Sequence, residues 1–294
     1  MDQISVTEKK YICDGIKQNI RTDGRTNKDY RKLELETSLI QQCHGSARVR
    51  TVNSGTDVLV AIKLEVITPD EKTPKCGALD VSVDFTASSS LHFRSREFDI
   101  ESISLANKLS EVLMSSGAVD LESLCIIEKL FAWKLYIDIQ ILSDDGNLFD
   151  IIFYAINAAL QTTRLPKTNP LADLDNGERD FEIDDDPSTY IRLNCKQLPL
   201  CITLSQISGK LVVDCSKVEE DCSSCALRVA VNKEGKIVSL QNVSGTISQE
   251  LLFGSIEIAN HVASALFTSL DKIVEKDDEL WTNDVIPNRR GFFA

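Results

Sequence analysis

The sequence predicts an α+β protein built from two similar halves, and three observations support this class. Runs of residues with a two-residue apolar period indicate strands, and each set of strands is followed by a three- to four-residue period that indicates a helix. A polar, acidic stretch separates the two sets. At 294 residues, of which 43% are hydrophobic and 26% charged, the chain is long enough to bury a sizeable core.

In the first half, alternating apolar residues predict a strand at 58–66, with a partner strand at 45–50 across a hairpin turn at 53–55. A further strand is expected at 79–85, followed by a helix at 103–113 with Asp99 as its N-cap and Gly117 beyond its end. The last strand, 135–141, leads through Asp144-Asp145-Gly146 into an apolar helix at 148–163.

The second half repeats this order. Strands are expected at 200–205, 210–214, 225–231 and 237–243, and a long amphipathic helix at 252–276. We therefore divide the chain into an N-terminal arm (1–30), a first half (31–166), an acidic connector (167–190), a second half (191–276) and a flexible tail (277–294). A hydrated loop explains the carboxylates of the connector more simply than a metal cage does.

The net charge of −13 is the wrong sign for a protein that binds polyanions through its overall field. Any contact with nucleic acid must therefore be a local patch. No apolar run approaches the roughly 20 residues that span a bilayer, and the N-terminus lacks the order of a signal peptide, so we expect no membrane association and a location inside the cell.

Nine cysteines, an odd number, suit a reducing compartment, and we interpret most of them as small buried hydrophobic residues. The pair Cys222 and Cys225 has the spacing of half a zinc site, but the sequence offers no second Cys or His pair at a suitable distance. We expect no metal and no cofactor. None of the three histidines has a Ser or Cys partner at a recognisable spacing, which argues against a nucleophilic hydrolase.

Several local motifs occur in a specific order. They are Arg21-Thr22-Asp23-Gly24-Arg25, Asp29-Tyr30-Arg31, Gly45-Ser46-Ala47-Arg48-Val49, Asp145-Gly146-Asn147-Leu148-Phe149-Asp150, 158–166, Asp185-Asp186-Pro187 and Val213-Asp214 followed by Glu219-Glu220. In this order they resemble the RNase PH family, and among its members the ring subunits of the eukaryotic RNA exosome of the Rrp forty-two type.

The resemblance covers nearly the whole chain. It implies an RNase PH-like fold, with a β-α-β-β-α arrangement similar to domain 2 of ribosomal protein S5 in the first half and a similar second half. It also implies assembly of six such subunits into a ring with a central channel for single-stranded RNA, together with S1/KH-type cap subunits, in nucleus, nucleolus and cytoplasm.

Phosphorolysis requires cations and backbone donors that bracket inorganic phosphate against the RNA phosphodiester, because the two anions repel. Active members of the family have an arginine pair at the start of the first-half helix. The matching stretch here is Arg96-Glu97-Phe98-Asp99-Ile100-Glu101, in which three carboxylates would repel phosphate. Asn147 stands where the resemblance implies a small hydroxyl residue after the Asp-Gly turn. The sequence therefore predicts an enzyme fold without catalytic residues.

Asp214 lies where the family's acidic catalytic stretch begins, and we interpret it as a vestigial position, a strand-end residue that caps a turn, rather than a surviving acid. Arg21 and Arg25 have two readings, an RNA contact or a structural pair with a carboxylate, and we favour the structural pair.

The expected function is that of a non-catalytic ring subunit that helps form the RNA channel for 3′-to-5′ processing and degradation of rRNA, mRNA and non-coding RNA. Arg94 and Arg96, in the loop before the first helix, and Lys108, on that helix, are the candidate RNA contacts, with solvated surface charges as the alternative. A phosphate-dependent 3′-to-5′ exoribonuclease is the competing function.

Overall fold

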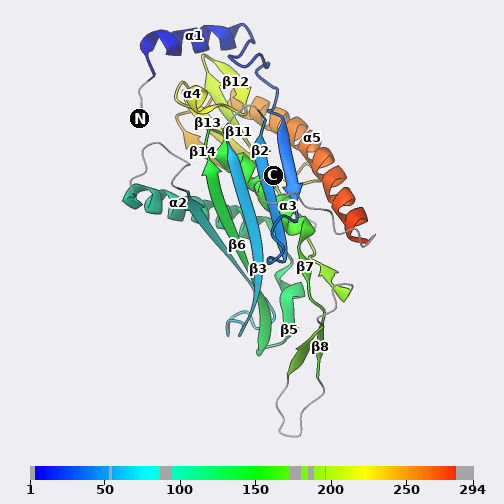
Figure 1. Ribbon diagram of the computed structural model, residues 1–294. Helices are drawn as coiled ribbons and strands as arrows, with labels where there is room; N and C mark the ends of the chain where they lie inside the picture. Colours follow the sequence, from blue (N-terminus) through cyan, green and yellow to red (C-terminus); the bar gives the residue numbers. More distant parts are fainter. Residues whose placement is uncertain are drawn as a thin grey trace.

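The computed structural model describes residues 4–52, 55–86, 95–171, 180–184, 189–195 and 197–282. The first half forms a mixed sheet with the strand order β1-β2-β3-β6-β4, and a short β5 pairs with β6 at its end (Figure 1). The bounds of these strands are β1 Leu33–Thr37, β2 Gly45–Thr51, β3 Asp57–Ile67, β4 Ala78–Phe85, β5 Cys125–Ile127 and β6 Phe131–Ser143. Among the described strand pairs of this sheet, β4 and β6 alone run parallel, because helix α2 (Ser95–Ser116) crosses over between them.

The second half is an antiparallel sheet with the order β12-β11-β13-β14. Its strands are β11 Leu200–Ile207, β12 Lys210–Val213, β13 Cys225–Val231 and β14 Ile237–Ser244. In the antiparallel register between β11 and β13, Thr203 is paired with Arg228, so these two side chains lie side by side on the two central strands of the sheet.

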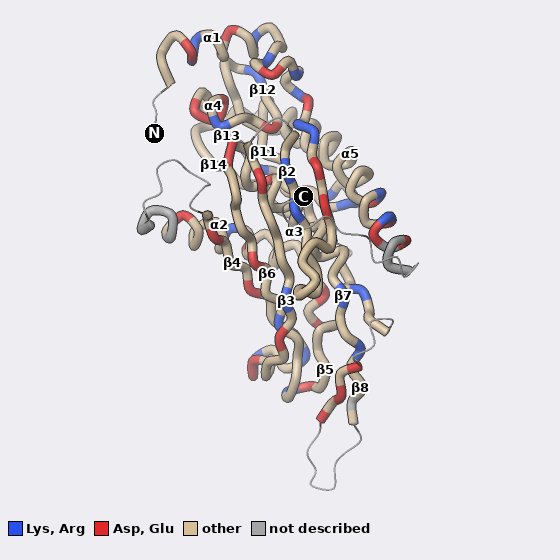
Figure 2. The backbone as a smooth tube through the Cα atoms, in the orientation of Figure 1, with Lys and Arg blue, Asp and Glu red and all other residues tan. Residues whose placement is uncertain are grey.

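Helix α3 (Leu148–Thr162) lies between the two sheets and belongs to the core of both halves (Figure 1). Nearly all of its residues are buried, because it packs on β2 and β3 with one side and on β11 with another. Figure 2 shows the helix almost without charged residues. Asp150, near its start, is its only Asp, Glu, Lys or Arg. A buried carboxylate in such an apolar helix is costly unless it is hydrogen-bonded, so we expect polar partners at this end of α3.

The long helix α5 (Gln249–Thr282) covers the second sheet and also contacts α3 and β1. By length and composition it could span a membrane, which the sequence analysis did not detect. Its apolar residues Ala259, Ala263 and Leu270 are buried in the shared core, so the helix is an integral part of the fold. Helix α1 (Val6–Lys17) lies apart, on a small core of its own in which Ile12 and Ile16 pack against Ile207 and Val212.

Four short strands and two short helices complete the described structure. Strand β7 (Arg164–Leu165) pairs with β10 (Ile191–Arg192), and β8 (Thr168–Pro170) pairs with β9 (Phe181–Ile183). The 3-10 helix η1 (Leu121–Leu124) precedes β5, and α4 (Lys217–Glu220) follows β12.

Several sequence-based boundaries need correction. The flexible tail was predicted to begin at residue 277, and this boundary is wrong. Helix α5 continues to Thr282, and Asp277 accepts hydrogen bonds from the hydroxyls of Thr37 and Ser38. The first-half helix begins at Ser95, so Asp99 lies inside it and is not its N-cap. Part of the expected acidic connector is the β8–β9 hairpin, and half of the connector (172–179 and 185–188) lies outside the described residues. Residues 53–54 of the predicted hairpin turn also lie outside them.

All nine cysteines are free thiols. Four of them, Cys201, Cys215, Cys222 and Cys225, are buried and the other five are half-buried, so the expectation that most of the cysteines are buried is wrong.

Candidate functional site

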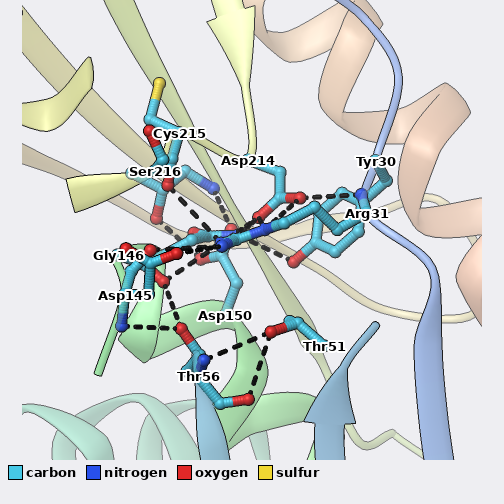
Figure 3. Close-up of polar contacts among 12 residues, drawn as sticks. Tyr30, Arg31, Thr51, Thr56, Asp145, Gly146, Asp150, Asp214, Cys215 and Ser216 are labelled. Atoms are coloured by element: carbon cyan, nitrogen blue, oxygen red, sulfur yellow. Dashed lines mark hydrogen bonds and ion pairs between the residues drawn. The ribbon is translucent and has the colours of Figure 1, made fainter. Parts of the chain in front are cut away.

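The charged groups of the interior gather where α3 begins and β12 ends (Figure 3). The turn into α3 consists of Gly146, with φ +85°, and Asn147, with φ +54°. A Cβ atom at Gly146 would lie 2.5 Å from the backbone nitrogen of Lys217, so only glycine allows the turn to approach the segment after β12. The glycine therefore brings the start of α3 against residues 214–217.

Asp214 is the centre of this cluster. It follows β12 with φ +51°, and its residue is 0% exposed. One carboxylate oxygen, Oδ1, accepts hydrogen bonds from Arg31 Nη2 at 2.8 Å and from Asn147 Nδ2 at 2.7 Å. The other, Oδ2, accepts from the backbone N–H of Arg31 at 2.7 Å and from Arg25 Nη1 at 2.9 Å. Both oxygens are thus engaged within the protein.

Arg31 joins three segments of the chain. Beyond its bonds to Asp214, its guanidinium donates to the backbone carbonyls of Asp145 and Gly146, both at 3.1 Å. Its side chain is 5% exposed, and the pKa of Arg31 is raised, because the hydrogen bond and charge of Asp214 outweigh the effect of burial. Arg31 is therefore a structural cation whose donors point into the protein.

A second buried pair lies beside the first. Arg21 Nε donates to Glu219 Oε1 at 2.9 Å, and its Nη atoms donate to the carbonyls of Val213 and Asp214. This pair, like Arg25 with Asp214 and Asp23, confirms the structural reading of Arg21 and Arg25. Asp214 lies directly after the last residue of β12, in a turn with φ +51°.

The N-terminus of α3, a natural position for an anion, already holds a carboxylate. Glu220 Oε1 accepts the backbone N–H of Asn147 at 2.7 Å. Burial raises the pKa of Glu220, while the Asn147 N–H and Lys217 oppose that effect. Lys217 in turn lies 2.7 Å from Asp144.

Asp150 extends the cluster toward the second sheet. Its oxygens accept hydrogen bonds from the backbone N–H and the hydroxyl of Thr203, both at 2.6 Å. Burial raises the pKa of Asp150 to about 7, although Thr203 and Arg228 favour its ionised form. The Arg228 guanidinium stacks on the ring of Phe149, 3.5 Å from its centroid, and its Nε has no hydrogen-bond partner among the residues that the structure describes.

Both halves of the chain match family models. Residues 29–166 match the model described as "3′ exoribonuclease family, domain 1" (RNase PH), and residues 197–261 match "3′ exoribonuclease family, domain 2". The chain belongs to the RNase PH family. Its fold is the RNase PH-like fold of the α+β class, as predicted.

Individual RNase PH relatives agree with this assignment. The exosome complex component Rrp42 of Methanothermobacter thermautotrophicus is 32% identical over 92% of this chain and 97% of its own length. The Rrp42 component of Methanosarcina acetivorans is also 32% identical, over 90% of this chain and 94% of its own. A chain of the Archaeoglobus fulgidus exosome "with RNA bound to the active site" superposes with a TM-score of 0.74 and 28% identity, over 89% of this chain and 96% of that chain. The relatives therefore place the chain among RNase PH-like exosome subunits of the Rrp42 type.

Of the three predicted RNA contacts, the structure describes the side chain of Lys108. Lys108 is exposed on α2, and Arg94 lies outside the described residues. Arg96 lies within α2 rather than in a loop before it, which corrects its predicted placement. Of the three carboxylates expected to repel phosphate, Glu101 acts on the site, since its charge helps to raise the pKa of Lys217 against the effect of burial.

Sequence reasoning missed Arg31 as a partner of Asp214, and Tyr30 and Glu220 as partners of Asn147. Arg31, Tyr30 and Glu220 were visible only as members of ordered motifs, with no role assigned. Asn147 was expected only to alter an anion cradle, whereas its side-chain amide also donates to the Tyr30 hydroxyl at 2.9 Å. Burial raises the pKa of Tyr30, so this phenol stays protonated as part of the packed network.

Proposed function

We propose that the chain is a non-catalytic subunit of an exosome ring, which helps to form the channel through which RNA passes for 3′-to-5′ processing and degradation. The observation that carries the proposal is the state of Asp214. A catalytic acid must contact substrate, and this carboxylate is wholly buried and hydrogen-bonded to two arginines and an amide.

The surrounding charges support the same conclusion. A phosphate ion would have to be held by free cations and backbone donors. Arg21, Arg25, Arg31 and Lys217 are each paired with a carboxylate, and Glu220 engages the N–H at the start of α3. Arg228 is the remaining cation of the described cluster, and it stacks on Phe149 beside Asp150. An incoming phosphate would therefore compete with carboxylates that the fold already holds in place.

The proposal that this chain assembles into a ring and contacts RNA rests on its relatives. Those relatives are named as exosome components, and the Archaeoglobus structure is of an exosome with bound RNA. By analogy we propose RNase PH-like neighbours in a six-membered ring, S1/KH-type caps, and action in nucleus, nucleolus and cytoplasm.

A phosphorolysis assay tests the central claim. The purified full-length chain is incubated with single-stranded RNA and phosphate, and we expect no nucleoside diphosphate above the level of a D214N variant. Release that depends on phosphate and is lost in D214N would overturn the proposal. Native mass spectrometry with other ring subunits, in which we expect hetero-oligomers, separates a missing activity from an unfolded sample.

The alternative is a phosphate-dependent 3′-to-5′ exoribonuclease. It is favoured by one observation, the match of both domains to 3′ exoribonuclease models. The assay above decides between the two functions.

The RNA-contact proposal for Arg94, Arg96 and Lys108 has a separate test. Replacing all three by Ala in the reconstituted ring should reduce crosslinking to single-stranded RNA, because each cation neutralises a phosphate. Replacement of exposed Lys233, Lys236 and Lys210 is the matched control. Unchanged crosslinking in the first variant would contradict the assignment.

A further inference from the structure

Two half-buried cysteines, Cys76 and Cys125, meet at one end of the first sheet. Strand β6 has two edges, and β3 occupies one of them as far as Ala132. Strand β5 also pairs with Ala132, through Cys125, so it lies on the other edge. That is the edge along which β4 begins, with Ala78 opposite Lys134. Cys76 comes two residues before Ala78, and the chain therefore brings it beside Cys125.

Contacts on both sides of the two cysteines confirm that their segments face each other. On one side, Lys75 Nζ lies 3.0 Å from Glu128 Oε1. On the other side, the backbone N–H of Gly77 donates to the carbonyl of Leu121 at 2.8 Å, and a Cβ atom on Gly77 would lie 2.6 Å from the Cβ of Leu124. The segment before β4 thus runs antiparallel to the segment around β5, and both cysteines lie between these contacts.

The thiols are also close enough to influence each other. Burial raises the pKa of Cys125, and the charges of Glu128 and Cys76 raise it further. Facing residues on neighbouring antiparallel segments have Cα atoms about 4.5–5.5 Å apart, which is within the range of about 4.4–6.8 Å that a disulfide needs. Both residues are half-buried, so a small oxidant in solution has access to them.

We propose that Cys76 and Cys125 are an oxidation site, at which hydrogen peroxide converts the two thiols into a disulfide within one chain. The thiolate of one cysteine attacks an oxygen of the peroxide, the O–O bond breaks, and a sulfenic acid and water form. The thiolate of the other cysteine then attacks this sulfur, the S–O bond breaks, and the oxygen leaves as a second water. Two thiols and one peroxide thus give one disulfide and two waters, with sulfur oxidised and the peroxide reduced.

The disulfide would constrain a large part of the first half. The loop that it closes, residues 76–125, contains β4 and the crossover helix α2. Closing this loop restricts the unfolded chain more than the folded one, so the oxidised protein should resist unfolding better than the reduced protein. A small thiol such as glutathione reverses the bond by thiol–disulfide exchange. The inference does not depend on the proposed function, because it concerns the end of the sheet away from Asp214.

Peptide mapping of the full-length chain tests the proposal. The reduced chain is treated with hydrogen peroxide, its remaining thiols are blocked with N-ethylmaleimide, and it is digested with trypsin without a reductant. Trypsin places the two cysteines in separate peptides, 76–94 and 109–129, neither of which contains another cysteine. We expect mass spectrometry to show these peptides joined in the monomeric chain and separated by dithiothreitol. Peptides that stay unlinked, or that are linked only in a disulfide-bonded dimer, would overturn the inference.

Substitutions test whether the two cysteines are selective partners. In C125S, oxidation of Cys76 has no second thiol to resolve it, so peptide 76–94 should carry a sulfinic or sulfonic acid instead of the link. C43S is the matched control, because Cys43 is also half-buried, and it should leave the link unchanged. Links from Cys125 to other cysteines in equal yield, or loss of the Cys76 link in C43S, would contradict the pairing.

Urea denaturation gives a second readout that a random oxidation would not produce. Peroxide should raise the midpoint of the wild-type chain, and dithiothreitol should return it to the value of the reduced chain. Oxidised C76S, which exposes all other residues to the same peroxide, should show no increase. A peroxide-induced change in midpoint that is the same for the wild type and C76S would overturn the loop closure.

Discussion

Replacement of Arg31 by Met tests the interpretation of the Asp214 cluster as a structural centre. Methionine preserves much of the aliphatic volume and removes the guanidinium, which donates to both oxygens of Asp214 and to the carbonyls of Asp145 and Gly146. The carboxylate left behind is 0% exposed and cannot recover its hydration.

The expected loss follows from these contacts. Removing one partner of a buried ion pair costs about 3–5 kcal/mol in free energy of unfolding. Asp214 retains Arg25, Asn147 and a backbone N–H, so we expect the lower end of that range, about 3 kcal/mol. Urea denaturation at pH 7, followed by circular dichroism, measures the change.

The control is Arg50→Met, which removes an exposed ion pair at 3.4 Å from Glu34, with side chains 47% and 55% exposed. This change should cost less than about 1 kcal/mol. The double variant Arg31→Met, Asp214→Asn should lose less than the sum of its single changes, because the unpaired charge is gone. A cost for Arg31→Met equal to that of the Arg50 control, or strict additivity in the double variant, would refute the reasoning.

Three further predictions concern other parts of the fold. Because the pKa of Asp150 is raised from 3.8 to about 7, the native state binds more protons than the unfolded state between these values, and the free energy of unfolding should fall as pH rises from about 4 to 7. Denaturation measured across this pH range should give a smaller dependence of the free energy of unfolding on pH for D150N than for the wild type. An unchanged dependence in D150N would contradict the assignment. Gly146→Ala should destabilise the protein by about 3 kcal/mol or more, because the new Cβ would lie 2.5 Å from the backbone nitrogen of Lys217 and the residue has a positive φ. Gly209→Ala, at φ +78° with no atom near the new Cβ, is the control and should cost about 1 kcal/mol. Equal melting temperatures of the two variants would contradict the close approach at Gly146. Asp277→Asn should lower the free energy of unfolding by about 1 kcal/mol, because it weakens the contacts of this carboxylate with Thr37, Ser38 and Arg164. Glu275→Gln, at an exposed position of the same helix, should leave the stability unchanged. Equal denaturation midpoints for the two variants would contradict the role of Asp277 in holding the end of α5.

The sequence predicted the long apolar runs between turn residues well. The expected strand at 225–231 is β13, Cys225–Val231, and the expected helix at 148–163 is α3, Leu148–Thr162. Both are nearly continuous apolar runs, and their lengths suit a buried strand and a buried helix respectively. The arm helix α1 and strand β1 were missed, because each buries few residues and gives a short, weak pattern.

The end of α5 shows what local patterns cannot reveal. Charged residues follow Lys276 and interrupt the apolar period, which led to the predicted tail. The helix continues because Asp277 is held by β1 and by Arg164, residues far away in the sequence. Tertiary contacts thus determine this boundary.

The candidate site was predictable in part. The Asp-Gly-Asn turn and Asp214 were recognised from ordered motifs, and their structural roles follow from that order. Arg31 and Asp214 are 183 residues apart, however, and no spacing rule links a guanidinium just before β1 to a carboxylate after β12. The buried network of donors around Asp214 becomes visible only when the two halves are folded together.

This network connects the stability of the fold with its proposed lack of catalysis. Asp214 receives hydrogen bonds from Arg25 of the arm, from Arg31 just before β1 and from Asn147 at the start of α3, so one carboxylate holds three segments together. An acid that transfers a proton must instead contact a substrate and change its hydrogen bonds during the reaction. Opening Asp214 to RNA would break bonds of the kind that cost several kcal/mol, a large fraction of the stability of a domain. A carboxylate used in this way is therefore a poor catalyst for the same reason that it is a good structural centre.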